Sequence, residues 1–178
     1  MKVLGRLAQG VAVLAFLLIL LTPLLARQGK LTGQPAPDFE LEDLDGEMLR
    51  LGSMKGKVVV LDFWAVWCGP CQDSVPFFQL LEDKYAADGL KVIGLHVDDR
   101  VPPVEKVKQY LDEKNVEYSN ALSTTDVDNA FKIYAMPTTY MIDRDGVLAE
   151  IHVGFNPSTT PDKLEEDVRK LLGLEPSE

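Results

Sequence analysis

The stretch VVVLDFWAVWCGPCQDSVPFF, Val58–Phe78, holds the only two cysteines of the 178-residue chain, Cys68 and Cys71. It opens with a nearly continuous apolar run of strand length, which is typical of a central strand covered on both faces. The residues after the cysteines have helical periodicity. The two thiols are therefore expected where a buried strand passes into a helix.

Three roles are open to such a pair: part of a metal site, a structural disulfide, or a redox centre. A structural zinc site needs about four ligands, and the chain adds only His96 and His152, each inside a predicted strand. A disulfide across so short a loop constrains the unfolded chain very little. The pattern favours a redox pair that works without a metal or a cofactor.

The position of Cys68 suits redox chemistry. Just before a helix, its sulfur would lie near unsatisfied backbone N–H groups and the positive end of the helix dipole, which favours thiolate over thiol. A thiolate attacks a disulfide, and a second thiol one helical turn later can resolve the mixed disulfide. We expect Cys68 to attack and Cys71 to resolve.

The segment DFWAVWCGPC resembles the active site of thioredoxin. The matching positions are Asp62, Trp64, Trp67, Cys68, Gly69, Pro70, Cys71 and Pro76. The wider domain, residues 35–173, resembles the membrane-anchored TlpA/ResA-like thiol:disulfide oxidoreductases, which have a redoxin/AhpC-TSA-like domain. The resemblance includes the N-terminal hairpin and the first core strand. It also includes residues 101–120, which resemble the helix and strand that this branch inserts into the thioredoxin fold.

The predicted order of elements agrees with that resemblance. A hairpin turning at Asp45 and Gly46 precedes the central strand; then come helix, strand, helix, short strand, helix, a second hairpin at residues 144–146, and a final helix. Asp126 is the expected N-cap of the third helix. The fold class is α/β: a thioredoxin fold with an N-terminal β-hairpin, a central inserted helix and strand, and a mixed sheet flanked by helices.

The segment AMPTTYMID resembles the cis-proline loop of the same family, with Pro137 as its proline. Sequence alone favours a trans bond, because cis X-Pro bonds are uncommon, and an ordinary proline at a strand start is the alternative. The backbone of Met136 would pair with an extended partner chain. The resemblance thus implies a substrate-binding surface. Its residues are Trp67, Gly69, Pro70, Met136 and Pro137.

Asp62 departs from many TlpA-like proteins, which carry asparagine there; aspartate is the choice of thioredoxins. Thioredoxins also place a lysine on the next strand, where this chain has Gly94. A carboxyl in an apolar strand should have a raised pKa and could exchange a proton with Cys71, or could serve only as a structural hydrogen-bond partner. Trp67 could form an apolar rim around Cys68 or pack in the core.

The first 27 residues differ in composition from the rest. Residues 7–26, LAQGVAVLAFLLILLTPLLA, carry no charge, and their helical length suits a hydrocarbon core of roughly 30 Å. We expect residues 1–27 to be a transmembrane signal anchor, in preference to a cleaved signal peptide, residues 28–36 a linker and residues 37–175 the thioredoxin-like domain. Lys2 and Arg6 favour an inside N-terminus, hence a single-pass protein of the cell membrane with an extracytoplasmic domain.

Charge and cysteine count restrict the partners. Residues 28–178 include 15 basic and 28 acidic residues, which gives a net charge of −13. This charge makes nucleic acid a poor partner. The resemblance implies disulfide-containing protein substrates, among them apocytochrome c before haem attachment, and a membrane thiol transporter as electron donor. The Gly-Pro dipeptide favours reduction. The rivals are an oxidant or isomerase of secreted proteins, and a binding module without turnover.

Overall fold

The computed structural model describes residues 31–97 and 104–174. The chain divides into two compact units, residues 1–31 and 32–178, and every described helix and strand belongs to the second. The predicted membrane span at residues 7–26 lies outside the described residues. Within the described ranges, no helix has the length and apolarity needed to cross a membrane.

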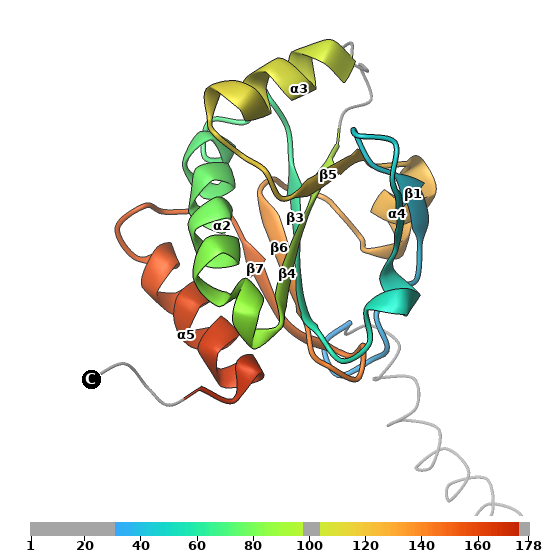
Figure 1. The fold of residues 1–178 in the computed structure, drawn as a ribbon, viewed down its shortest axis with the longest axis vertical. Coiled ribbons are helices and arrows are strands. Elements are labelled where there is room, and N and C mark those ends of the chain that lie inside the picture. The colour runs from blue at the N-terminus through green and yellow to red at the C-terminus, as the bar shows by residue number, and fades with distance from the viewer. Residues whose placement is uncertain (1–30, 98–103, 175–178) are drawn as a thin grey trace, which may run out of the picture. The chain divides into compact units, whose positions relative to one another are not determined.

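The centre of the fold is β3 (Val58–Trp64), whose seven residues are all buried. It pairs in parallel with β4 (Leu90–His96) and antiparallel with β6 (Thr138–Ile142). β5 (Ser119–Leu122) extends the sheet beyond β4, and β7 (Leu148–Val153) extends it beyond β6. The order β5-β4-β3-β6-β7 confirms a mixed sheet with the apolar run at its middle (Figure 1).

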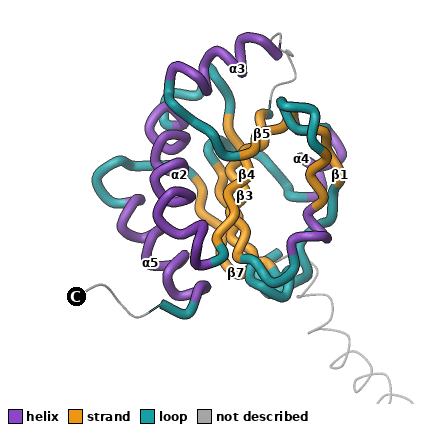
Figure 2. Tube along the Cα trace, in the orientation of Figure 1, coloured by secondary structure: helices purple, strands orange, loops and turns teal. Residues whose placement is uncertain are grey.

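Helices cover both faces of this sheet, which Figures 1 and 2 show edge-on. α2 (Cys71–Tyr85) and α5 (Thr160–Leu172) lie on one face, and α4 (Thr125–Ala130) lies on the other. α3 (Val104–Glu113) lies beyond the end of the sheet where β3 leads into α2. Two 3-10 turns, η1 (Leu51–Met54) and η2 (Ala86–Asp88), complete the order.

The N-terminal hairpin forms a small sheet of its own. β1 (Glu40–Glu42) pairs antiparallel with β2 (Met48–Arg50), and the turn between them uses Gly46 at φ 89°, a conformation that favours glycine. A single bridge, Asp43 to Ala121, connects this hairpin to β5 at the edge of the central sheet. The hairpin therefore covers an edge that would otherwise be open.

Apolar residues of β3 alternate between two cores, as the period of a strand requires. On the side of α2 and α5 the buried cluster includes Val58, Val60, Phe78, Leu81, Val92, Leu164 and Val168. On the other side Phe63 and Phe131 lie 5.3 Å apart between ring centroids, with Phe39 and Tyr140 in edge contacts to Phe131. A third cluster, around Trp64, contains both cysteines.

Two local expectations need revision. The N-cap of α4 is Thr124, whose Oγ1 accepts a hydrogen bond from the Val127 N–H, so the prediction of Asp126 was wrong; Asp126 lies in the first turn. The end of the expected linker also takes part in the fold. Gly33 N–H donates to the Leu148 carbonyl at 2.7 Å, and Ala36 N–H donates to the Gly146 carbonyl at 2.9 Å.

Candidate active site

The two cysteines form a disulfide at the point where β3 leads into α2. The S–S distance is 2.09 Å, and Cys71 is the first residue of α2. Cys71 is fully buried, whereas Cys68 retains 5% of its surface. An incoming reactant therefore meets Cys68 first, the order expected if Cys68 attacks and Cys71 resolves.

The backbone around the pair differs from the sequence expectation in one respect. Cys71 N–H donates to the Cys68 carbonyl, and Gln72 N–H donates to the Gly69 carbonyl, both at 3.1 Å. These first-turn N–H groups are thus already bonded to turn carbonyls and do not point unsatisfied at the Cys68 sulfur. The aligned dipoles of α2 remain as the contribution that favours a thiolate here.

Asp62 lies in β3 with no exposed surface. Thr139 Oγ1 on β6 donates to Asp62 Oδ1 over 3.5 Å, a long and weak hydrogen bond, and Asp62 Oδ2 has no partner among the described residues. Burial raises the pKa of Asp62 to about 8, and the Thr139 bond opposes that shift only in part. The carboxyl can therefore gain or lose a proton near neutral pH.

Gly94 lies directly opposite Asp62 in the parallel β3–β4 pair. A Cβ atom at Gly94 would lie 1.9 Å from Asn120 Oδ1, so the Asn120 side chain fills the space of any side chain at this position. Asn120 is held there because its Oδ1 accepts from Trp64 Nε1 at 3.0 Å and its Nδ2 donates to the Tyr118 carbonyl at 2.8 Å. A lysine beside Asp62 is therefore sterically excluded.

The loop before β6 reaches the cysteines. The Met136–Pro137 bond is cis, as the family resemblance implies. Met136 packs against the buried cluster that contains Cys68 and Cys71. Thr138 Oγ1 donates to the Ala135 carbonyl at 2.8 Å, which fixes the loop at the start of β6.

Two exposed aromatic side chains accompany these residues. Trp67 is 51% exposed, so it lies at the surface and not in the core, whereas Trp64 is fully buried. Tyr134 is 83% exposed and only two residues before Met136.

The histidines have structural partners. The Val66 N–H donates to His96 Nε2 at 3.2 Å, and His152 Nε2 lies 3.0 Å from Asp167 Oδ2 on α5. Within residues 31–97 and 104–174, no three His, Cys, Asp or Glu side chains are grouped as a metal site would require.

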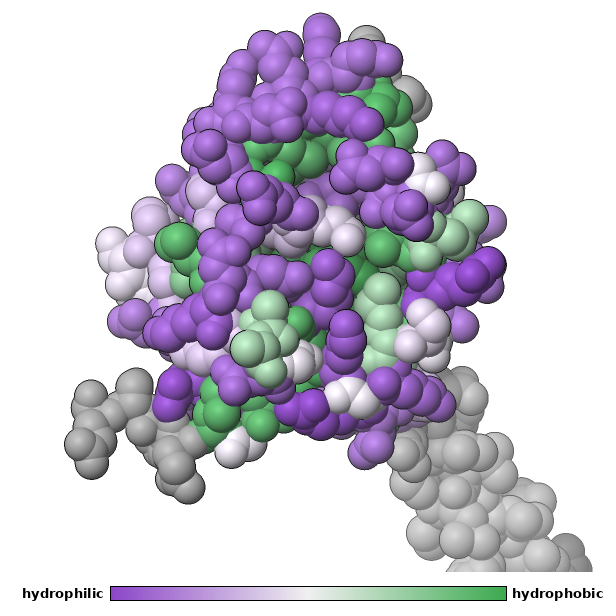
Figure 3. All heavy atoms as spheres, viewed as in Figure 1, coloured by the Kyte–Doolittle hydropathy of each residue, from purple (hydrophilic) through white to green (hydrophobic). Residues whose placement is uncertain are grey.

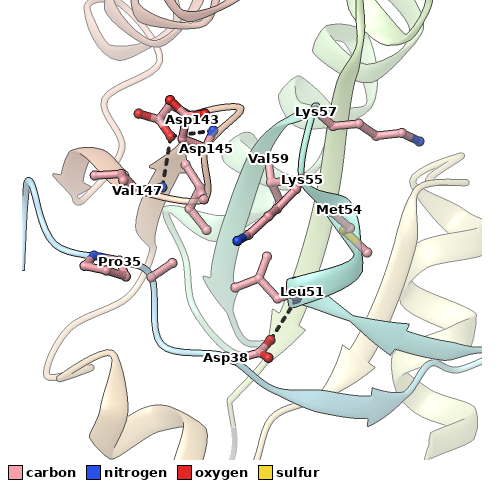
Figure 4. Close-up of a pocket in the computed structure, with 14 residues that line it drawn as sticks. Pro35, Asp38, Leu51, Met54, Lys55, Lys57, Val59, Asp143, Asp145 and Val147 are labelled. Carbon is pink, nitrogen blue, oxygen red and sulfur yellow. Dashed lines mark hydrogen bonds between the residues drawn. The ribbon is translucent and has the colours of Figure 1, made fainter.

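One surface pocket lies away from the disulfide. It is a cavity of about 290 Å³ near the start of β3, whereas Cys68 follows the end of that strand. Figure 4 shows Asp38 and Asp143 at its wall; Asp38 accepts from the Gly52 N–H, and Asp143 accepts from the Asp145 and Val147 N–H groups. Both carboxylates are therefore engaged by the backbone, and neither cysteine lines this pocket.

Comparison with known proteins agrees with this geometry. The Redoxin family model matches residues 31–168. Thioredoxin-like protein YneN of Bacillus subtilis (strain 168) is 35% identical over 122 residues, 68% of this chain and 71% of YneN. Thiol-disulfide oxidoreductase ResA of Bacillus cereus is 33% identical over 141 residues, 78% of each chain.

A solved structure shares the fold. The crystal structure of a protein from Chlorobium tepidum, described as the thiol:disulfide interchange protein DsbE, has a TM-score of 0.73 and 34% identity, covering 80% of this chain and 98% of that one. With the family match and the Cys68–Cys71 disulfide, this makes the protein a thioredoxin-fold, TlpA/ResA-like thiol-disulfide oxidoreductase. The chain belongs to the Redoxin family.

Proposed function

We propose that this oxidoreductase reduces disulfide bonds of proteins outside the cytoplasm while residues 1–27 anchor it in the membrane. The observation that carries the proposal is the Cys68–Cys71 disulfide itself, which follows the strand that holds the buried Asp62 and belongs to the cluster against which Met136 packs. The Gly-Pro dipeptide between the cysteines, the same as in thioredoxin, supports reduction as the direction.

The reaction has two steps. In the first, the Cys68 thiolate attacks one sulfur of the substrate disulfide; a mixed disulfide forms, and the other substrate sulfur leaves as a thiolate. In the second, Cys71 gives its proton to Asp62 and attacks the Cys68 sulfur. The second substrate sulfur then leaves, two electrons have passed to the substrate, and the internal disulfide remains.

Substrate approach would use the exposed side of the cysteine loop. Trp67 offers an apolar surface beside Cys68, and Met136 offers its backbone to an extended segment of the partner. Gly69 and Pro70 lie between the cysteines, and a Cβ at Gly69 would meet no atom within 4 Å, so a partner chain has room to pass close to the backbone.

The partners follow from the family resemblance and from the cysteine count. Apocytochrome c, which must be reduced before haem attachment, is our proposed substrate. The chain has no third cysteine with which to relay electrons internally, so an external donor must restore the thiols. A membrane thiol transporter is the donor we propose.

The test is to trap the mixed disulfide with the full-length Cys71→Ala variant. Insulin serves as a defined disulfide substrate, and the product is resolved on non-reducing gels. A covalent adduct is expected, because Cys68 attacks but no resolving thiol follows. Cys68→Ala is the matched control and should give no adduct. Adduct formation by Cys68→Ala but not by Cys71→Ala would reverse the assigned roles, and no adduct with either variant would contradict the function.

A further inference from the structure

The loop of residues 65–70, which carries Cys68, is held by a side chain from the neighbouring strand. His96 is the last residue of β4 and is only 2% exposed. Its Nε2 atom accepts a hydrogen bond from the Val66 N–H at 3.2 Å, and Val66 lies two residues before Cys68. A titratable side chain is thus bonded directly to the backbone of this loop.

One peptide group connects His96 to Cys68. The Ala65 carbonyl and the Val66 N–H belong to the same planar peptide unit. While its N–H donates to His96 Nε2, its carbonyl accepts from the Cys68 N–H at 3.0 Å. The histidine therefore sets the orientation of this peptide plane at one end, and the plane holds the backbone of Cys68 at the other.

His96 itself is firmly placed in the sheet. It pairs with Trp64 on β3 and with Leu122 on β5, and its carbonyl accepts from the Ser123 N–H at 2.9 Å. The Trp64 and His96 rings are perpendicular, with centroids 5.0 Å apart. In a parallel ladder that continued, the Val66 N–H would bond to a backbone carbonyl of the adjacent strand. The imidazole takes the place of that carbonyl, so the chain can turn toward α2 without losing the hydrogen bond.

We propose that His96 is a positioning residue for disulfide reduction, whose neutral Nε2 fixes the peptide before Val66 and thereby the place from which Cys68 attacks. The inference rests on the proposed function, because it concerns the attacking role of Cys68. A protonated imidazole carries an N–H on both nitrogens and cannot accept from the Val66 N–H. Histidine changes its charge between about pH 5 and 8, so acid should release the loop.

Other titratable groups lie on the elements around His96. Among the described residues they are Asp62 of β3, Cys68 and Cys71, Asp73 in the first turn of α2, Tyr110 of α3 with Lys114 over its ring, and Asp128 of α4, which accepts from Ser123 Oγ. Burial raises the pKa of Asp62 to about 8 and also raises the pKa of Tyr110 and of Asp128. Cys68 must itself be a thiolate to attack. Several groups thus contribute to any decline of activity in acid, and substitution of His96 isolates its part.

The second histidine of the chain provides a matched control. His152 lies on β7, and its Nε2 is 3.0 Å from Asp167 Oδ2 on α5. In the central sheet, β6 separates β7 from β3. Replacing His152 removes the same kind of side chain and leaves the contact between His96 and Val66 in place.

The experiment compares full-length His96→Leu, His96→Gln and His152→Gln with the wild type. Leucine offers no acceptor to the Val66 N–H, whereas glutamine offers an amide oxygen that does not titrate. Rapid mixing with insulin between about pH 5 and 8 measures attack by Cys68. Each rate is divided by the fraction of Cys68 present as thiolate, which ultraviolet absorbance reports. Amide hydrogen exchange at Val66, followed by NMR, reports the hydrogen bond independently of activity.

The expected results differ between the variants. His96→Leu should slow attack per thiolate roughly tenfold at neutral pH, within the roughly 10²-fold loss that a misplacement of about 1 Å can cause. It should also speed amide exchange at Val66. His96→Gln should recover most of the lost rate and keep Val66 protected. In the wild type, attack per thiolate should fall in acid toward the His96→Leu level. His152→Gln should share this profile, and His96→Gln should not.

Two results would overturn the role of His96: attack per thiolate in His96→Leu that equals the wild type, or an acid decline that persists unchanged in His96→Gln. If His96→Leu does not fold, the comparison of His96→Gln with the wild type across pH decides alone. A wild type that reduces insulin while His96→Leu is unimpaired leaves the proposed function standing. If the wild type does not reduce insulin, the proposed function fails, and the role of His96 in it fails as well.

Discussion

At the scale of single residues, the proton chemistry depends on a carboxyl that burial keeps mostly protonated at neutral pH. Asp62 has no exposed surface, and its pKa is about 8. A general base works best when its pKa is near the working pH, because it is then available in both forms. Resolution should accordingly accelerate as the pH rises toward 8.

Asp62→Asn should stabilise the fold in a pH-dependent way. The native pKa is raised above the unfolded value, so the favourable contribution of the neutral carboxyl is complete below about pH 4 and is lost as the pH rises through about 8. The free energy of unfolding of the variant should therefore exceed that of the wild type by a margin that grows over this range. The growth is at most about 1.4 kcal/mol per pH unit. Urea unfolding at a series of pH values measures it, and parallel pH curves for the two proteins would refute it.

Gly94→Ala should be strongly destabilising. The new Cβ would lie 1.9 Å from Asn120 Oδ1, and moving Asn120 removes the acceptor of the buried Trp64 Nε1–H. Overpacking alone costs about 1–3 kcal/mol, and the unpaired indole adds to that. Gly69→Ala, which meets no atom within 4 Å, is the control and should change the unfolding free energy by no more than about 0.5 kcal/mol. Equal effects of the two variants in urea unfolding would be inconsistent with the packing described.

Sequence patterns identified the reactive residues but not their surroundings. Cys68, Cys71 and Asp62 lie within one short segment whose strand and helix patterns are local, so their burial and order could be predicted. Asn120 over Gly94 and Tyr110 beside Trp64 could not, because such contacts join residues far apart in the chain. The local pattern of apolar and polar residues does not predict contacts of this kind.

At the scale of elements, the order of helices and strands was predictable, while a cap was not. Thr124 and Asp126 are both residue types that cap helices, and composition does not choose between them. The structure selects Thr124, since its Oγ1 accepts from the Val127 N–H. The hairpin turns could be predicted from the sequence because turns of this kind need a positive φ, which favours glycine, and Gly46 and Gly146 adopt it.

Thr124→Ala should therefore cost about 1 kcal/mol of stability, the usual loss for an N-cap. Asp126→Ala should lose only the dipole interaction of a first-turn acid, about 0.3–1 kcal/mol at low salt. Chemical unfolding at low and high salt separates the two, because only the Asp126 effect should decline with salt. A larger and salt-independent loss in Asp126→Ala would return the cap to that residue.

At the scale of the whole molecule, charge and topology are the remaining questions. Hydrophilic residues cover most of the face shown in Figure 3, consistent with the excess of acidic residues from residue 28 onward. An excess of acidic residues makes nucleic acid an unfavourable partner on electrostatic grounds. Our proposal that this domain lies outside the cytoplasm rests on the apolar segment and the charges that precede it.

That topology predicts protease sensitivity. If the proposed topology is right, protease added to spheroplasts should digest the domain of the full-length protein, because the domain would then be accessible on the outer side of the membrane. A cytoplasmic protein probed in the same sample should survive and so report intact membranes. Survival of the domain until the membrane is lysed would reverse the orientation.

The central claim, a thiol pair that reduces its substrates, is tested most directly by the reduction potential of the Cys68–Cys71 couple. Equilibrium titration against dithiothreitol and glutathione, followed by mass spectrometry of alkylated thiols, measures it. We expect a value near that of thioredoxin, about −270 mV. A value near that of the oxidant DsbA, about −120 mV, would contradict the account and make the protein an oxidant.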